Sequence, residues 1–556
     1  IDSGISTRME VVVSAEDNAE IRRVSLTNNS TRAREIELTS YAECVLAAPA
    51  TDAAHPAFSN LFIETEFVSA ENAILAHRRR RSSDEPEIWG VHVVVAEGDA
   101  IGSVQYESDR GRFLGRGRSP ANPIAVMEDR PLSNTTGAVL DPVFSLRRRV
   151  RIEPGQTVNC SFATGVANSR EEALALADKY HDPSIFEREL RLAWTKAQVE
   201  MSHLKTDAEE AHLFQRLASR IIYSDPSLRP RPHVLALNTK SQSSLWAHGI
   251  SGDLPILVVR IEKSADLPTV RMVVRGHEYL HFKGLKVDLV ILNDSPTTYR
   301  QELHRELETM VRTGGLQSFQ DKPAGIYLRR ADQMSESDRI LLHAVARAVI
   351  VADRGLLQDQ LERSQVDPPL PPTFVARNAP QIYPEHVVAP ADLSFFNGLG
   401  GFQQGGREYV TVLGSEQWTP LPWANVIGNK GGFGFQITET GGGYTWSENS
   451  HENRLTPWSN DPISDPSGEA IYLRDEDSGT FWSATALPIR EKEPYLVRHG
   501  QGYTVFEHTS HGISQELLVF APLDANVKIS LLRLRNRTAR KRRLTITSYY
   551  KLVLGV

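Results

Sequence analysis

The chain has 556 residues, too many for one ordinary hydrophobic core, so we expect two to four domains. Its 40% apolar and 24% charged residues are typical of a folded, water-soluble protein, and a net charge of −7 excludes a general attraction to nucleic acid. Its two cysteines, Cys44 and Cys160, provide no disulfide framework and stand in no metal-ligand spacing. No run approaches 18 consecutive apolar residues, so we expect no direct membrane insertion.

An internal repeat is the most informative feature of the sequence. Residues 4–47 align without a gap to residues 512–555, with 15 identities in 44 positions, among them Asn28 with Asn536. The apolar alternation matches as well, which indicates a duplicated module. Apolar residues at period two on both sides of a polar turn predict a β-hairpin with one buried face. We expect both ends of the chain to be cuts within a longer protein.

In chain order, residues 1–165 are predicted to be mostly antiparallel β structure. Helical periodicity takes over in residues 166–367, where short strands are predicted at 287–292 and 326–329 and a long amphipathic segment at 335–361. Residues 368–390 are a proline-rich linker, because proline continues neither helices nor central strands. From residue 391 to residue 556 the pattern returns to β structure.

Tryptophan is concentrated in the last segment. Five of the eight tryptophans lie within 65 residues, interleaved with Asn, Asp, Glu and Arg: Trp418, Trp423, Trp446, Trp458 and Trp482. Flat aromatic rings stack on sugar rings and planar polar side chains bracket hydroxyl groups, so this pattern is typical of carbohydrate contact. The alternative interpretation is that these residues fill a large sandwich core.

The pentapeptide HEYLH at residues 277–281 formally matches a zinc signature. On a helix, His277 and His281 share one face, with Glu278 as a base. Apolar residues occupy the same stripe and no third-ligand motif follows, so the histidines can equally border a core. A zinc hydrolase is therefore a weak alternative, and we expect no metal and no other cofactor.

Residues 394–556 resemble the N-terminal β-sandwich of the family 94 glycoside phosphorylases, the cellobiose and chitobiose phosphorylase group. The matching segments include FFNGLGGFQQGGREYVTVL, TPLPWANVIGN, FGFQITETGGGYTW, NRLTPWSNDPISDPSGEAIYLRDEDSG and RHGQGYTVFEH. Residues 1–165 look like the later half of a second such sandwich. The segments at 243–261 and 277–294 look like the opening of the family's (α/α)6 domain. Two tandem modules of this kind are the arrangement of cyclic β-1,2-glucan synthases.

This resemblance implies a multidomain β plus α fold. It consists of two antiparallel β-sandwich (supersandwich) domains, each incomplete, separated by a helical, degenerate (α/α)-barrel-like region. The family's catalytic Asp lies in a D-W-N-D-like context in the barrel, and no such string occurs here. The family's sugar-contacting Gln-Arg pair aligns with Ser59-Asn60, a departure that argues against sugar binding by the first copy. We therefore expect no catalytic residue in this chain.

By resemblance, the longer protein makes cyclic β-1,2-glucan from UDP-glucose at the cytoplasmic face of the bacterial inner membrane. This chain is then its non-catalytic, soluble scaffold. Its partners are β-1,2-glucan or another glucooligosaccharide and the remaining domains. The expected sugar contacts are Trp446, Asn453, Arg454, Trp458, Asp461, Arg474 and His499. Two further alternatives are that the chain is itself a glycoside phosphorylase or hydrolase, and that it is a spacer that binds no sugar.

Overall fold

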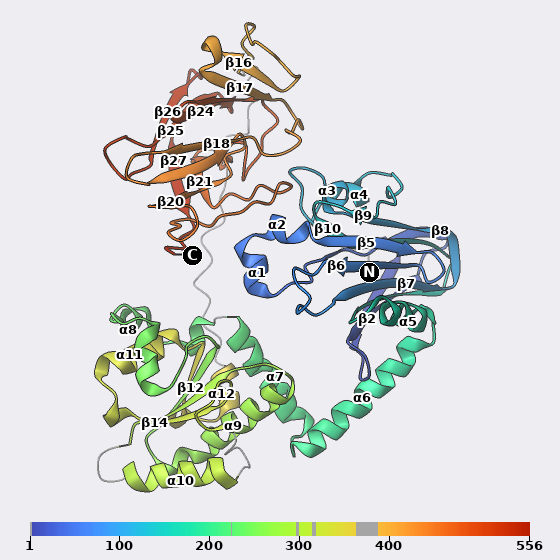
Figure 1. Ribbon diagram of the computed structural model, residues 1–556, viewed down its shortest axis with the longest axis vertical. Coiled ribbons are helices and arrows are strands. Elements are labelled where there is room, and N and C mark those ends of the chain that lie inside the picture. The colour runs from blue at the N-terminus through green and yellow to red at the C-terminus, as the bar shows by residue number, and fades with distance from the viewer. Residues whose placement is uncertain (1–2, 224, 296–299, 314–318, 363–386, 556) are drawn as a thin grey trace. The chain divides into compact units, whose positions relative to one another are not determined.

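The computed structural model describes residues 3–223, 225–295, 300–313, 319–362 and 387–555 (Figure 1). The chain divides into two compact units, Ile1–Ala193 with Thr373–Val556, and Trp194–Pro372. Most of the predicted proline-rich linker falls outside the described residues. Within the described part of the chain, no helix combines the length and the apolar character needed to cross a bilayer.

The N-terminal half of the first unit is an antiparallel β-sandwich. Its larger sheet has the strand order β1-β2-β11-β7-β6-β5-β9, and in the smaller sheet β10 pairs with β3 and β4 along one edge and with β8 along the other. The antiparallel β structure predicted for residues 1–165 is confirmed. The strands are β1 (Ile5–Val13), β2 (Ala19–Asn28), β3 (Arg34–Thr39), β4 (Ala42–Glu43), β5 (Ile63–Val68), β6 (Ala73–Arg78), β7 (Trp89–Glu97), β8 (Asp99–Asp109), β9 (Gly137–Ala138), β10 (Pro142–Ile152) and β11 (Thr157–Ala167).

Period-two alternation drives this packing, because it gives each sheet one apolar face. Ile74 and Val94 of the larger sheet meet Phe144 and Leu146 of the smaller one in a buried core. The outer face of the larger sheet is covered by α5, whose Ala173, Ala177 and Tyr180 pack on Leu75, Val91 and Val93. The helices of this half are α1 (Pro49–Ala54), α2 (Pro56–Asn60), α3 (Arg110–Leu114), α4 (Ile124–Met127) and α5 (Arg170–His181), followed by α6 (Ile185–His203).

The C-terminal half of the first unit is a second antiparallel sandwich. Its sheets have the orders β16-β17-β23-β24-β25-β26, β18-β19-β20 and β22-β21-β27. Phe435, Leu473, Trp482, Phe506 and Leu517 form its core. The strands are β16 (Gly400–Gln403), β17 (Glu408–Leu413), β18 (Ala424–Gly428), β19 (Gly434–Thr438), β20 (Gly443–Trp446), β21 (Glu469–Asp475), β22 (Phe481–Ser483), β23 (Tyr495–Gly500), β24 (Tyr503–Ser510), β25 (Ile513–Phe520), β26 (Ile529–Asn536) and β27 (Leu544–Tyr550).

The duplicated segments fold in the same way. The pair β1 and β2 has Ile5 opposite Asn28, and the pair β25 and β26 has Ile513 opposite Asn536, which is the same register. In each copy the asparagine Nδ2 donates to the carbonyl four residues later, at 2.8 Å in the first copy and 2.7 Å in the second. The asparagine Oδ1 accepts from the backbone N–H two residues later at 3.0 Å in both copies. The duplication read from the sequence therefore extends to individual hydrogen bonds.

The second unit is a doubly wound α/β domain. Four parallel strands run in the order β14-β13-β12-β15, and helices cover both faces of the sheet. On one face Phe214 and Val273 pack on Leu257, and on the other Leu341 packs on Val258. The elements are α7 (Ala208–Ile222), α8 (Pro232–Leu235), β12 (Ile256–Ile261), α9 (Leu267–Phe282), β13 (Asp288–Asn293), α10 (Arg300–Thr313), β14 (Ile326–Arg330), α11 (Glu336–Val345), β15 (Ala348–Val351) and α12 (Leu357–Glu362).

This arrangement differs from the barrel-like helical region expected between the sandwiches. The strands predicted at 287–292 and 326–329 are present, but they belong to a parallel sheet, and the described residues close no helical barrel. The segment 335–361, expected to be one helix, is divided among α11, β15 and α12. The physical reason is that strands buried on both faces appear in the sequence as short continuous apolar runs, which periodicity cannot distinguish from buried helix.

Candidate functional site

A polar pocket of about 870 Å³ lies within the first unit, where the segment 458–462 faces the N-terminal sandwich. Trp458 and Asp461 come from the connection between β20 and β21. The N-terminal half contributes α1, α2, the end of β4 and the residues that follow β8 and precede β10, through polar side chains that sequence reasoning did not assign to a site. The polar lining comprises Glu43, Asp52, Asn60, Arg110, Asp141, Ser459, Asn460 and Asp461.

Arg110 connects the two sandwiches at the wall of this pocket. Its Nη1 and Nη2 donate to the two carboxylate oxygens of Asp461 at 2.9 and 3.0 Å, and Nη1 also donates to Asp141 at 2.9 Å. Its Nε donates to Glu43 at 2.9 Å. A guanidinium presents a rigid fork of donors, so this bidentate geometry is the favourable one for a carboxylate. Arg110 thereby holds three carboxylates in one cluster.

The two aspartates of the cluster have opposite pKa shifts. Burial raises the pKa of Asp461, but hydrogen bonds from Arg110 and Ser464 outweigh it and lower the pKa to about 2. For Asp141 burial dominates, and despite the attraction of Arg110 the pKa is raised. Asp461 is therefore a fixed anion whose two oxygens are occupied by Arg110. Asp141 accepts a hydrogen bond from Asn60 Nδ2 at 3.1 Å on its other oxygen.

Trp458 is the aromatic side chain of the pocket. His55 meets it edge-on, with ring centroids 4.9 Å apart, and the Arg454 guanidinium lies 5.4 Å from its centroid. Trp446 lies near Trp458. It forms a backbone bridge with Arg454, and its ring centroid is 5.1 Å from that of Tyr444. Three of the expected sugar contacts, Trp446, Arg454 and Trp458, therefore lie side by side.

Asn453, Arg474 and His499 lie differently. Asn453 is exposed next to Arg454, with its Nδ2 3.4 Å from Glu448. Arg474 is exposed on β21, in a shallow depression that includes Phe481 and Thr545. His499 on β23 interacts with Trp423 O and Thr504 Oγ1, each at 3.1 Å, and burial lowers its pKa to about 4. The structure thus does not bring Arg474 and His499 to the pocket with Trp458.

The segment that carries Asp461 is fixed by packing. Ile463 is buried with Phe113 and Leu114 of α3, and its carbonyl accepts from Gly117 N at 2.8 Å and from Arg116 Nη1 at 3.1 Å. Sequence reasoning missed Arg110, Asp141 and these contacts because the partners are some 350 residues apart and belong to no local motif. Only the departure noted at Ser59-Asn60 pointed to this part of the first copy.

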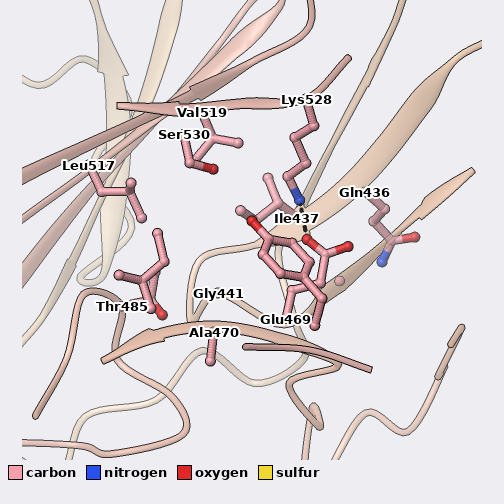
Figure 2. Close-up of a pocket in the computed structure, with 13 residues that line it drawn as sticks. Gln436, Ile437, Gly441, Glu469, Ala470, Thr485, Leu517, Val519, Lys528 and Ser530 are labelled. Atoms are coloured by element: carbon pink, nitrogen blue, oxygen red, sulfur yellow. Dashed lines mark hydrogen bonds and ion pairs between the residues drawn. The ribbon is translucent and has the colours of Figure 1, made fainter. Parts of the chain in front are cut away.

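A second, much smaller cavity lies in the C-terminal sandwich between β19, β21, β25 and β26 (Figure 2). Lys528 and Glu469 form an ion pair of 2.5 Å at its wall (Figure 2). Glu469 also accepts from Thr445 and Thr456, so its polar atoms are satisfied within the protein. Much of the remaining lining is aliphatic. Tyr550 is the aromatic side chain in the lining, and the polar pair Lys528 and Glu469 is already satisfied, so this cavity offers a polyol fewer open polar groups than the pocket at Trp458.

The HEYLH segment forms part of α9. His277 is 3% exposed, its Nε2 lies 2.8 Å from the Val287 carbonyl, and burial lowers its pKa. His281 packs edge-on against Phe319, with centroids 4.7 Å apart. Within the part of the chain that the structure describes, no group of three metal-ligating side chains includes either histidine. These contacts favour the interpretation that both histidines border a core.

The chain matches the glycosyl hydrolase 94 supersandwich domain over residues 1–183 and 407–556. It is 37% identical to the cyclic beta-(1,2)-glucan synthase NdvB of Rhizobium meliloti (strain 1021), over 99% of this chain and 20% of that protein. It is 29% identical to N,N'-diacetylchitobiose phosphorylase of Vibrio proteolyticus over 27% of this chain and 19% of that protein. It is 30% identical to solabiose phosphorylase of Paenibacillus borealis over 33% of this chain and 23% of that protein. The chain spans about a fifth of the length of these curated relatives.

Proposed function

Because the chain belongs to the glycosyl hydrolase 94 supersandwich family, we propose that it is a non-catalytic, glucan-binding scaffold within a longer enzyme that makes cyclic β-1,2-glucan. The similarity to a cyclic glucan synthase over nearly the whole chain supports this proposal. The partners are then a β-1,2-linked glucooligosaccharide and the remaining domains of the longer enzyme. Those domains would supply the transfer of glucose and the attachment to the bacterial inner membrane.

The observation that carries the proposal is the composition of the pocket at Trp458. A sugar offers apolar C–H faces and vicinal hydroxyls, which require an aromatic ring together with fixed donors and acceptors. Trp458 is the ring, and Asn60 and Asp141 are polar groups held in place by their mutual hydrogen bond. Arg110 is bound by Glu43, Asp141 and Asp461, so among the described lining residues its charge is already neutralised. A neutral oligosaccharide fits this chemistry.

Calorimetric titration of the chain with linear β-1,2-glucooligosaccharides tests the proposal. We expect measurable heat for the natural chain and roughly fivefold to tenfold weaker binding for Trp458→Ala, because contact with one aromatic ring contributes about 1–1.5 kcal/mol. Trp194→Ala is the matched control, since Trp194 is 66% exposed on α6 and should leave binding unchanged. Thermal melting of each variant verifies that it is folded.

Two results would contradict the proposal. One is the absence of heat with the natural chain, which favours a spacer without a sugar site. The other is equal binding by the natural chain and Trp458→Ala, which moves the site elsewhere. Release of glucose in the same solutions, or of a sugar phosphate once inorganic phosphate is added, would show instead that the chain is itself a glycosidase or phosphorylase.

A further inference from the structure

A compact group of imidazoles and carboxylates lies in the C-terminal sandwich, away from the pocket at Trp458. Glu491 and Glu493 come from the segment that leads into β23, and His508 comes from the adjacent strand β24. One ligand atom of each of these three residues lies within 4.8 Å of those of the others. His511, in the turn between β24 and β25, places its Nε2 2.5 Å from Glu491 Oε1. No sequence motif predicts this group.

The hydrogen bonds of His508 determine where its proton lies. Its Nδ1 is 3.0 Å from the Pro494 carbonyl oxygen, which can only accept, so Nδ1 carries the hydrogen. In the neutral ring Nε2 then has a lone pair, and it points at Glu491 Oε2 at 3.0 Å. Two acceptors facing each other at this distance repel. The space between them therefore holds either a proton, carried by the ring or by the Glu491 carboxyl, or a metal ion.

The surroundings of His508 make a metal ion the better occupant. Its side chain is fully buried, and its ring stacks on Tyr495 with centroids 3.9 Å apart and planes within 5°. An imidazole that donates one N–H to a backbone carbonyl and presents its other nitrogen to carboxylates has the orientation characteristic of metal-bound histidine. A second carboxylate, Glu493, completes a group of three nitrogen and oxygen ligands that suits zinc, and the His511 imidazole orients Glu491 through its other carboxylate oxygen.

We propose that Glu491, Glu493 and His508 bind a divalent transition-metal ion, with Zn²⁺ as the fitting metal and His511 as a residue that orients Glu491. This site goes beyond the proposed glucan-binding function and does not depend on it. The ion would join the segment before β23 to the β24–β25 hairpin. Arg490, which neighbours Glu491, stacks on Trp418 with 4.4 Å between guanidinium carbon and ring centroid, so the metal would also fix that cation–π contact. Its role is therefore structural.

Zinc titration of the EDTA-treated full chain, followed by calorimetry and by thermal melting, tests the site. We expect one Zn²⁺ per chain and a higher melting temperature with metal, since a ligand that binds only the folded state stabilises it. Replacing Zn²⁺ with Co²⁺ should give the visible absorption of a four-coordinate site. Glu493→Gln should weaken zinc binding at least tenfold while leaving the melting temperature of the metal-free chain unchanged, because Glu493 lies outside the Tyr495 stack.

His281→Gln is the matched control, because it removes one histidine of the HEYLH segment and should leave zinc binding intact. The proposal is overturned if the natural chain binds no zinc. It is also overturned if His281→Gln abolishes binding while Glu493→Gln retains it. Nitrogen NMR of His508 provides a third readout, and a ring that is doubly protonated near neutral pH and insensitive to added zinc would assign the space to a proton.

Discussion

Asp461 illustrates how a residue type suggests one role and its surroundings assign another. In the sequence, Asp461 lies close to tryptophans and is predicted to contact sugar hydroxyls. In the structure both of its oxygens are bound by Arg110, and Ser464 Oγ donates to one of them. Sugar contact by Asp461 stays a prediction, but the geometry favours an anchor between the two sandwiches.

The anchor should be visible in stability measurements. Asp461→Asn removes the anion that Arg110 binds and should cost about 2 kcal/mol, because charged hydrogen bonds contribute roughly 1.5–3 kcal/mol. The pKa of Asp461 is lowered to about 2 in the folded chain, so its stabilisation is complete above about pH 4 and is lost as the pH falls toward 2. The difference in melting temperature between natural and variant chains should close over that range. A difference that is constant with pH would contradict this account.

His499 should also reduce stability as the pH falls, but at mildly acidic pH. Burial lowers the pKa of His499 to about 4, whereas a histidine in the unfolded chain titrates near 6.5. Between these two pH values the unfolded chain binds a proton at His499 that the folded chain does not bind. Stability attributable to His499 is complete above about pH 6.5 and declines toward pH 4. In His499→Gln the melting temperature should fall less steeply over this range. Parallel pH profiles of the two proteins would rule out this role.

At the scale of elements, local signals predicted ends and periodicities well. Ser169 caps α5 by accepting from Glu172 N, and Asp207 forms a reciprocal capping box with Glu210 at the start of α7. The strand β15 was not predicted from the sequence. Its residues Ala348–Val351 continue the apolar spacing of α11, although their β-branched side chains favour a strand. The pocket could not be predicted in full, since Arg110 and Asp461 meet only through tertiary packing.

The duplicated asparagine turn provides a matched pair of substitutions. Asn28 is fully buried and also donates to the Ile152 carbonyl at 2.9 Å, whereas Asn536 is exposed. Asn28→Ala leaves buried donors and acceptors without partners and should cost about 2–3 kcal/mol, and Asn536→Ala about 1 kcal/mol. Chemical denaturation followed by tryptophan fluorescence compares the two. Equal losses would show that burial of the turn does not matter.

At the scale of the molecule, the α/β unit should be an independent folding domain. It has a complete parallel sheet with a buried core on each face, one around Leu257 and Leu289 and the other around Val258 and Val290. Residues 204–362 produced alone should therefore unfold cooperatively, within about 5 °C of the corresponding transition in the whole chain. Scanning calorimetry of both proteins provides the comparison. A broad transition without a heat-capacity peak would show that the unit depends on the rest of the chain.

The shared register of β1–β2 and β25–β26 also has a kinetic consequence. Each hairpin presents nearly the same backbone shape, and β2 of the first hairpin pairs with β11. During refolding, β11 can therefore pair with β2 or with β26. Pairing with β26 produces a swapped topology or an intermolecular aggregate. Such misassembly is characteristic of tandem repeats. Only 15 of the 44 aligned residues are identical in the two copies. This sequence divergence favours the native pairing of β11 with β2.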